Sequence, residues 1–193
     1  THMTKALCPF AAVTVIPPGM KGLPYESCDR WNAEALARLI DMRPDYVISG
    51  QMRGYKVQGD GDDRELMRDG LLRRWQDLRA YGIGVIVLRD TPLHPIAPAK
   101  CLAASRTDCD VPRSKALHGP EPALDAAALA GVPIIDLTDA ICEADVCRAV
   151  VGNVLAWRDN NHLSATYVRT MVPDIELALR AVITGRPAGG RED

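Results

Sequence analysis

Two long stretches of the chain carry apolar residues at the spacing of an amphipathic helix. The apolar positions are Trp31, Ala35, Leu36, Leu39 and Ile40 in residues 28–42, and Leu66, Leu71, Leu72, Trp75 and Leu78 in residues 63–81. Positions at this spacing fall on one face of a helix, so the pattern predicts a helix over each range. Pro44 ends the first helix, and Asp62 stands three residues before Glu65, at capping-box spacing, where the second begins.

Short and continuously apolar runs alternate with the helical patterns. Residues 45–49, 85–88 and 132–137 are such runs, and each predicts a buried strand. An alanine-rich helix is expected between the last two strands, over residues 121–130. Helices that alternate with buried strands indicate a mostly parallel sheet covered on both faces. The expected fold is therefore a three-layer α/β domain, and its ligands should bind just after Ser49, Leu88 and Leu137, where the strands end.

The two ends of the chain receive separate predictions. A final helix is expected over residues 163–183, with five apolar side chains directed inward: Val168, Val172, Ile175, Leu179 and Val182. Residues 185–193 are predicted to be a loose tail. Thr1-His2-Met3 is interpreted as a cloning remnant, which leaves residues 4–184 as one domain.

Composition and charge exclude several classes of protein. The 193 residues are 47% hydrophobic and 25% charged, as expected for a globular domain. With 23 Lys and Arg against 25 Asp and Glu, the net charge of −2 provides no basic surface for nucleic acid or anionic lipid. No segment has the length and apolar character of a membrane span, and the chain does not start with a signal peptide.

The six cysteines form three pairs that are close in sequence: Cys8 with Cys28, Cys101 with Cys109, and Cys142 with Cys147. Loop-closure entropy favours disulfides between these nearest neighbours. Zinc binding and inert buried thiols are the alternatives, although only the last pair comes near zinc-ligand spacing. Three disulfides would place the domain in an oxidising compartment, outside the cytoplasm. Because no signal peptide is present, we then expect the chain to be part of a longer protein.

His162 is the histidine with the most informative surroundings. His94 and His118 stand next to prolines or turns and are interpreted as loop residues. His162 follows Asp159 by three residues, so one tight loop can bring the carboxylate to the imidazole. A carboxylate at Nδ1 fixes the tautomer and leaves Nε2 as a base, as in serine esterases. The alternative is that Asp159 or Asn161 caps the following helix and His162 is merely nearby.

The block from Val150 to Tyr167, which contains Trp157-Arg158-Asp159-Asn160-Asn161-His162-Leu163-Ser164, resembles the closing block of SGNH domains fused to acyltransferase-3 membrane proteins. Five other segments agree with the family: Lys5 to Phe10, Cys28 to Trp31, Leu88 to Pro92, Cys109 to Arg113, and Asp136 to Asp139. The resemblance implies a flavodoxin-like SGNH fold with a Ser-His-Asp triad in an extracytoplasmic domain. Asp159 and His162 match the family's catalytic Asp and His.

The family's nucleophilic serine is missing from this sequence. It belongs to an early Gly-Asp-Ser-His block, and no Gly-Asp-Ser occurs among the 193 residues. The serines that are present do not match it: Ser27, Ser49, Ser105, Ser114 and Ser164. We therefore expect an N-terminally truncated domain without esterase turnover of its own.

Four residues are candidates for oxyanion or substrate contacts by the same resemblance. Gln51 and Arg53 follow the strand where the family places an oxyanion block, although its Asn is absent. The backbone N–H of Cys8 and the side chain of Asn153 are further candidates. The alternatives are an ion pair for Arg53, a solvated loop position for Gln51 and a turn cap for Asn153.

The resemblance implies that the parent protein O-acylates, and specifically acetylates, a glycan of the cell envelope. Its partners would be an acyl donor, the glycan acceptor and the membrane acyltransferase domain that tethers it, with no metal or organic cofactor and no nucleic acid. A carbohydrate esterase of the same fold and a non-catalytic glycan-binding module are the alternatives. Loss of the family's first strands would also expose the edge of the strand over residues 45–49, which we expect another copy or the N-terminal segment to cover.

Overall fold

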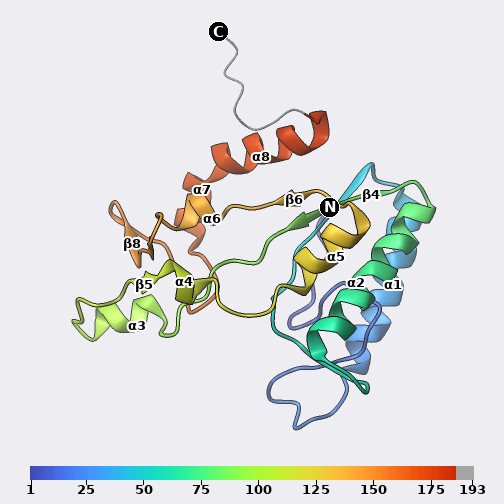
Figure 1. Cartoon of the computed structure of the whole chain (residues 1–193), viewed down its shortest axis with the longest axis horizontal. Coiled ribbons are helices and arrows are strands. Elements are labelled where there is room, and N and C mark those ends of the chain that lie inside the picture. Colours follow the sequence, from blue (N-terminus) through green and yellow to red (C-terminus); the bar gives the residue numbers. More distant parts are fainter. Residues whose placement is uncertain (186–193) are drawn as a thin grey trace. The chain divides into compact units, whose positions relative to one another are not determined.

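The computed structural model describes residues 1–185, which form two compact units. The first unit comprises Thr1–Asp90 and Gly119–Ile134, and the second comprises Thr91–His118 and the chain from Ile135 on. The elements of the first unit are β1 (Val15–Ile16), α1 (Glu26–Met42), β2 (Tyr46–Ser49), β3 (Lys56–Val57), α2 (Asp63–Ala80), β4 (Gly84–Leu88) and α5 (Pro122–Ala130), with β6 (Ile134–Ile135) at its border (Figure 1).

A parallel sheet is the centre of the first unit. Its strand order is β2-β4-β6, and β2 pairs with β4 in parallel so that Val47 lies opposite Val85. The side chains of Val85 and Val87 in β4 belong to a buried core that also takes residues from α1, α2 and α5. The α/β fold class and the parallel sheet are therefore as predicted. The predicted strand over residues 132–137 is shorter than expected, because only Ile134 and Ile135 have strand geometry.

Helix α2 shows how local sequence and packing cooperate. The Asp62 side chain accepts hydrogen bonds from the backbone N–H groups of Arg64 and Glu65, which confirms the predicted helix start. Leu71, Trp75 and Leu78 are fully buried. Gly70 allows a close approach in the middle of this helix, because a Cβ there would lie 2.4 Å from Cγ1 of Val13.

The second unit consists of short elements joined by loops. They are α3 (Pro98–Ala103), β5 (Val111–Pro112), α4 (Arg113–Ala116), α6 (Thr138–Ile141), β7 (Val146–Cys147), β8 (Val150–Val151), β9 (Val154–Leu155), α7 (Ala165–Thr170) and α8 (Val172–Thr184). Strands β5 and β7 pair antiparallel, as do β8 and β9. Trp157 is fully buried in the core of this unit and donates from Nε1 to the carbonyl of Arg148 at 3.1 Å.

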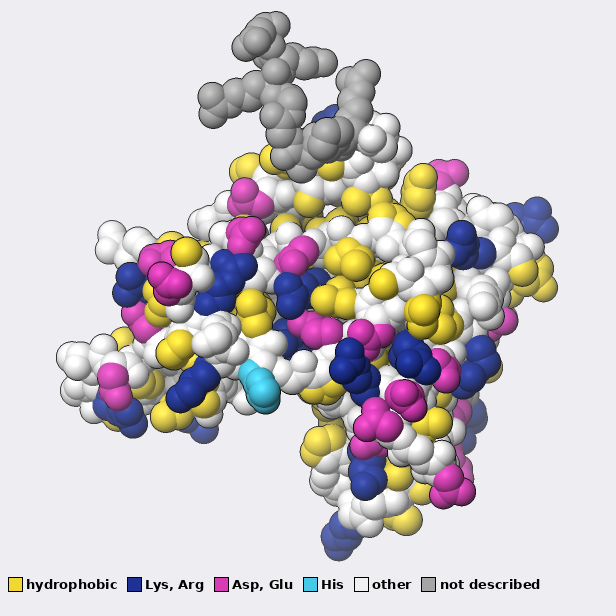
Figure 2. Space-filling model, in the orientation of Figure 1, with side chains coloured by type: hydrophobic (Ala, Val, Ile, Leu, Met, Phe, Trp, Pro, Cys, Tyr) yellow, Lys and Arg dark blue, Asp and Glu magenta, His cyan; other side chains and the backbone are white. Residues whose placement is uncertain are grey.

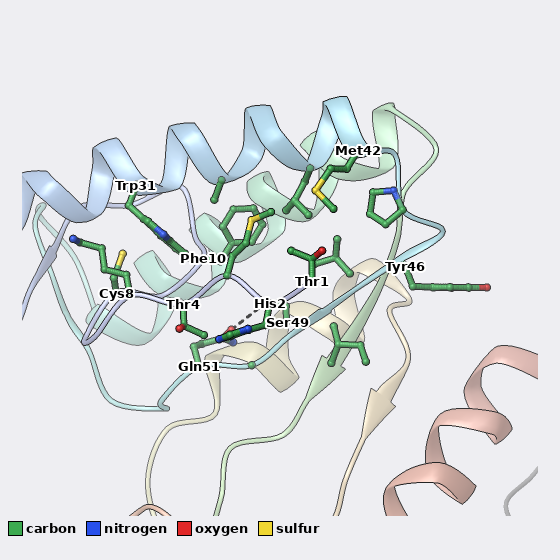
Figure 3. A pocket seen from close by; sticks show the side chains of 18 of the residues that line it. Thr1, His2, Thr4, Cys8, Phe10, Trp31, Met42, Tyr46, Ser49 and Gln51 are labelled. Atoms are coloured by element: carbon green, nitrogen blue, oxygen red, sulfur yellow. Dashed lines mark hydrogen bonds between the residues drawn. The ribbon is translucent and has the colours of Figure 1, made fainter.

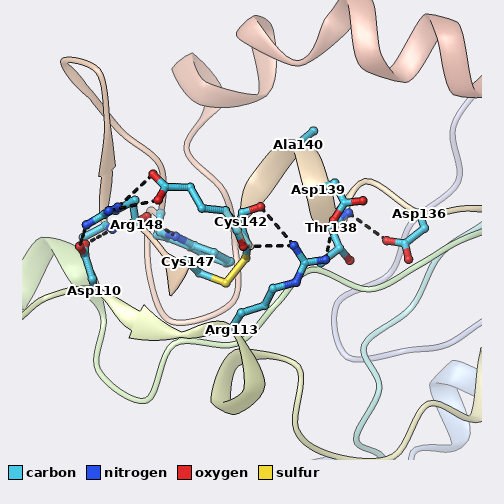
Figure 4. Close-up of a disulfide and its surroundings, with 12 residues drawn as sticks. Asp110, Arg113, Asp136, Thr138, Asp139, Ala140, Cys142, Cys147 and Arg148 are labelled. Atoms are coloured by element: carbon cyan, nitrogen blue, oxygen red, sulfur yellow. Dashed lines mark hydrogen bonds and ion pairs between the residues drawn. A yellow bond between two sulfur atoms is a disulfide. The ribbon is translucent and has the colours of Figure 1, made fainter. Parts of the chain in front are cut away.

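Three disulfides connect the cysteine pairs that the sequence indicated. They join Cys8 to Cys28 in the first unit, and Cys101 to Cys109 and Cys142 to Cys147 in the second. Figure 4 shows the last of these beside Arg113, whose Nη1 donates to the carbonyl oxygens of Cys142 and Glu143. A zinc site and free thiols are thereby excluded for these cysteines.

The predicted final helix is wrong as a single element. It is divided at Met171 into α7 and α8, because Pro173 stands in the first turn of α8 and has no N–H to continue the bonding of α7. Val168 and Val172 are exposed rather than directed inward, at 39% and 54%. The predicted loose tail, apart from Gly185, lies outside the described residues.

The distribution of charge and the length of the helices bear on contact with nucleic acid or a membrane. On the face drawn in Figure 2, basic and acidic side chains are interspersed. None of the helices in residues 1–185 combines the length and the apolar character that crossing a bilayer requires.

Candidate functional site

The loop between β9 and α7 brings Asp159 and His162 together. The sequence predicted that one tight loop could make this contact. His162 Nδ1 lies 2.9 Å from both Oδ1 and Oδ2 of Asp159. Oδ1 also accepts the backbone N–H groups of Asn161 at 3.1 Å and His162 at 2.8 Å. Because an ionised carboxylate only accepts hydrogen bonds, the proton of the neutral imidazole belongs on Nδ1 and the lone pair on Nε2.

Hydrogen bonding keeps the Asp159 carboxylate ionised. Partial burial raises the pKa of Asp159, but the N–H groups of Asn161 and His162 and the His162 ring outweigh burial and lower this pKa to about 2. The side chains of Asp159 and His162 are 37% and 58% exposed. Asp159 is therefore charged, the His162 ring is held in one orientation, and both side chains are accessible from solvent.

The loop that carries this pair is closed by backbone contacts at its base. The Arg158 N–H donates to the His162 carbonyl at 2.8 Å, and Trp157 and Leu163 form an isolated antiparallel bridge next to it. Ser164 is the N-cap of α7, since its Oγ accepts the N–H of Tyr167 at 3.1 Å. The helix-cap interpretation of Asp159 or Asn161 is thus wrong, because Ser164 fills that role and Asp159 binds amides of the loop.

Gln51 lies in the first unit, in the loop after β2. Its Oε1 accepts a hydrogen bond from Ser49 Oγ at 3.3 Å, and its buried Nε2 has no partner among the described residues. Ser49 itself is 5% exposed. Both residues line a cavity of about 600 Å³ between α1, β2 and the N-terminal segment (Figure 3). The side-chain amide of Gln51 can therefore donate a hydrogen bond. Gln51 is not the solvated loop residue of the alternative interpretation.

Arg53 belongs to a buried cluster of charges within the first unit. Its side chain is 3% exposed, with Nε 3.4 Å from Asp90 and Nη1 3.4 Å from Glu121. Its backbone N–H also donates to the Asp90 carboxylate, at 2.9 Å. Arg89 Nη2 in turn lies 2.7 Å from Glu121. The ion-pair interpretation of Arg53 therefore describes its surroundings, although the pair is buried rather than on the surface.

The last two oxyanion candidates have simpler surroundings. The N–H of Cys8 donates to the carbonyl of Lys5 at 3.2 Å, while its sulfur is in the disulfide with Cys28. Asn153 is exposed in the turn between β8 and β9, next to Gly152 with φ of +58°. Neither residue presents a buried donor without a partner within the described part of the chain.

No serine is paired with the Asp159–His162 dyad among the described residues of the second unit. Its serines are Ser105, Ser114 and Ser164, and in the residues described none of them is hydrogen-bonded to His162. Residues 1–185 also contain no group of three or more His, Cys, Asp or Glu side chains that could hold a metal ion.

Two residues that the sequence did not single out contact this loop. Thr91 Oγ1 donates to the carbonyl of Asn161 at 2.6 Å, and the His94 N–H donates to the carbonyl of Asn160 at 2.7 Å. His94 lies in a loop as predicted, but its ring is buried and lies 4.7 Å from the Trp157 ring. Only the position of Thr91 within the Leu88-to-Pro92 block pointed toward such a role.

Comparison with known proteins decides the family. A family model described as SGNH domain (fused to AT3 domains) matches residues 1–176. The chain belongs to this family. The resemblance inferred from the sequence is thereby confirmed, and both members of the dyad in this SGNH domain lie within the matched range.

A solved structure supports the fold of the SGNH domain. The periplasmic domain of a lipopolysaccharide acetyltransferase from Salmonella ser. Paratyphi A is similar to it with a TM-score of 0.59 and 15% sequence identity. The match covers 88% of the SGNH domain and 69% of the Salmonella chain. At this identity the likeness establishes a shared fold. No curated protein is significantly similar to the SGNH domain.

Proposed function

We propose that this SGNH domain supplies the general base and its orienting acid to a serine-centred acyl-transfer site of a membrane acyltransferase. The observation that carries the proposal is the contact of His162 Nδ1 with the Asp159 carboxylate at 2.9 Å. It leaves Nε2 to take a proton. Membership of a family fused to AT3 domains supports the reaction class.

In the proposed mechanism, Nε2 of His162 takes the proton of a serine hydroxyl while the serine oxygen attacks the carbonyl carbon of an acyl donor. Asp159 stabilises the imidazolium, which then protonates the leaving group as its bond to the acyl carbon breaks. A glycan hydroxyl attacks the resulting acyl-serine, and its proton passes through Nε2 to the departing serine oxygen. The product is an O-acyl ester on the glycan. Acetyl is the acyl group we favour, since the Salmonella relative is an acetyltransferase.

We propose that the serine comes from outside these 193 residues, which contain no Gly-Asp-Ser. The chain on its own should then leave an activated acyl ester such as p-nitrophenyl acetate unhydrolysed above the buffer rate. Clear turnover that His162→Ala abolishes would contradict this proposal, because it would show a nucleophile within the chain.

Gln51 is the oxyanion donor that we favour. Its Nε2 is buried without a partner among the described residues, whereas the guanidinium of Arg53 faces two carboxylates. Removal of one oxyanion donor costs about 10²- to 10³-fold in rate in a well-studied protease. We expect a loss of that order in acyl transfer by the membrane parent carrying Gln51→Leu, and unchanged transfer would remove Gln51 from the site.

We place the domain on the extracytoplasmic side of a membrane, tethered to the membrane acyltransferase. Three disulfides persist in an oxidising compartment, and the Salmonella relative is a periplasmic domain. Protection of all six cysteines from alkylation in intact cells, until a reductant is added, is the expected result. Rapid alkylation without reductant would contradict the assignment.

Acceptor competition separates transfer from the two alternatives. With the parent protein, an acyl donor and an added glycan, ester on the glycan is the product of transfer, and free acid alone is the product of an esterase. Glycan binding with neither product would identify a non-catalytic module.

We also propose that the free edge of β2 is covered in solution, by another copy or by the N-terminal segment. Strand β2 is at the end of the sheet order, and Tyr46 and Ile48 are 45% and 51% exposed. Thr4 and Lys5 line the same cavity as β2, which favours coverage by the N-terminal segment (Figure 3). Sedimentation should show either a dimer that Ile48→Lys dissociates or a monomer with protected β2 amides. A monomer whose β2 edge amides exchange freely would contradict the proposal.

A further inference from the structure

The segment from Thr91 to His94 holds the two peptide groups that position the dyad. The peptide between Asn160 and Asn161 accepts at its carbonyl from the His94 N–H at 2.7 Å and donates at its N–H to Asp159 at 3.1 Å. The next peptide, between Asn161 and His162, accepts from Thr91 Oγ1 at 2.6 Å and donates to Asp159 at 2.8 Å. Each peptide is therefore held at both ends, by residues 91–94 on one side and by the carboxylate on the other.

This arrangement couples the segment to Asp159. A peptide plane cannot rotate without moving its C=O and N–H together, because the group is planar. Hydrogen bonding at the carbonyl also polarises the peptide and strengthens its N–H as a donor. Donors from residues 91–94 thus fix the orientation of both N–H groups that bind Oδ1 of Asp159.

The segment is stiff and anchored within the second unit. Pro92 and Pro95 fix two backbone φ angles, and Pro92 is fully buried. The Leu93 N–H donates to the Ala116 carbonyl at 2.8 Å. The buried ring of His94 lies 4.7 Å from the Trp157 ring, and Trp157 immediately precedes the dyad loop. Thr91 and His94 consequently present their donors from a fixed support.

We propose that the Thr91 hydroxyl, together with the His94 backbone N–H, is a positioning group for the Asp159–His162 dyad. Thr91 acts through the peptide between Asn161 and His162, which accepts from its hydroxyl and donates to Asp159. The proposal rests on the proposed function only for the catalytic role of Asp159 and His162. The hydrogen-bond network itself is measurable in this chain without any acyl transfer.

The test uses the full chain with Thr91→Val, which removes the hydroxyl at nearly constant shape. Thr91→Ser keeps the hydroxyl, and Thr170→Val is the matched control. Thr170 Oγ1 also donates to a carbonyl of the second unit, that of Tyr167 at 2.7 Å. Amide hydrogen exchange is followed by NMR at Asn161 and His162, relative to Val87 in β4. The exchange of the His162 Nδ1 proton with water is measured in the same samples.

We expect Thr91→Val to speed exchange at the His162 amide, which belongs to the peptide that Thr91 binds, and at the His162 Nδ1 proton. The increase should be about threefold to tenfold, as expected for the loss of one hydrogen bond. Thr91→Ser should restore the wild-type rates, and Thr170→Val should leave them unchanged. Unchanged rates in Thr91→Val, or an equal increase at Val87, would overturn the proposal. If Thr91→Val does not fold, Thr91→Ser decides, because fast exchange at these sites despite the hydroxyl would equally overturn it. Loss of acyl transfer in the parent plays no part in this readout, so the two proposals fail separately.

Discussion

The two units use acidic side chains in opposite ways. In the first unit, Arg53 and Arg89 balance the charges of Asp90 and Glu121, and the Arg53 side chain is only 3% exposed. In the second unit, Asp159 holds His162 whose side chain is 58% exposed. A buried cluster whose charges face one another has a structural role, whereas a half-exposed pair with a free ring nitrogen can exchange protons. Exposure, more than residue type, separates the structural charges of this domain from its candidate catalytic ones.

The largest difference is expected when one side chain is removed from each region. Arg53→Met should lower the free energy of unfolding by about 3 kcal/mol, because it removes the buried guanidinium that faces both Asp90 and Glu121. The loss is placed at the low end of the range for such changes, since Glu121 keeps Arg89 and Asp90 keeps the backbone N–H of residue 53. His162→Ala should change it by less than about 0.5 kcal/mol, as expected at an exposed position. Urea denaturation monitored by tryptophan fluorescence measures both.

The control for Arg53 is Arg30→Met, which removes a pair with Glu26 whose side chains are 68% and 77% exposed. Its effect should stay below about 1 kcal/mol. Equal destabilisation by Arg53→Met and Arg30→Met would show that the cluster around Arg53 is not a buried structural element.

The next largest loss of stability is expected from overpacking in the first unit. Gly70→Ala places a Cβ 2.4 Å from Cγ1 of Val13 and should destabilise the protein by about 1–3 kcal/mol through overpacking. Val13→Ala in the same chain should recover part of this loss, because it removes the clashing methyl groups. Gly54→Ala is the control, since a Cβ at Gly54 meets nothing within 4 Å. Calorimetric unfolding that shows no difference between Gly70→Ala and Gly54→Ala would contradict the close approach.

The smallest expected effect concerns the pH dependence of the second unit. Burial lowers the pKa of His94 below its ordinary value of 6.5, with a weaker opposing effect from Asp110. The unfolded chain therefore binds the proton more readily, so stability is present above this value and is lost as the pH falls below it, by at most about 1.4 kcal/mol per pH unit. Urea midpoints between pH 7 and pH 5 should fall in the wild type and fall less in His94→Asn.

His118 supplies the matched comparison, because it is an exposed histidine of the same unit. His118→Asn should keep the wild-type pH dependence. A His94→Asn variant with the full wild-type slope would assign the acid sensitivity to other groups.

The parts of this structure that the sequence predicts well are local. Helix α2 begins where Asp62 and its apolar stripe place it, and disulfides form between neighbouring cysteines. Asp159 and His162 meet because His162 follows Asp159 by only three positions. These features depend on helical periodicity, loop closure and turn geometry, which a short segment contains in full.

The parts that escaped prediction are contacts between distant segments. Arg53 and Glu121 are 68 positions apart, and Thr91 and the Asn161 carbonyl are 70 apart. No local pattern encodes which distant partner a side chain finds, and a threonine that binds a distant carbonyl has the same letter in the sequence as one that faces solvent. The division of the last helix is a local feature, because Pro173 has no N–H to continue the helix, although the apolar spacing continues across it.

Acyl transfer by the membrane parent tests the central claim most directly. The rate of acyl transfer to glycan is compared between the wild type, His162→Ala and His118→Ala in the same membrane preparation. Loss of the general base should lower the rate by about 10²- to 10⁴-fold in His162→Ala, with His118→Ala at the wild-type rate. A His162→Ala protein that transfers acyl groups at the wild-type rate would contradict the account.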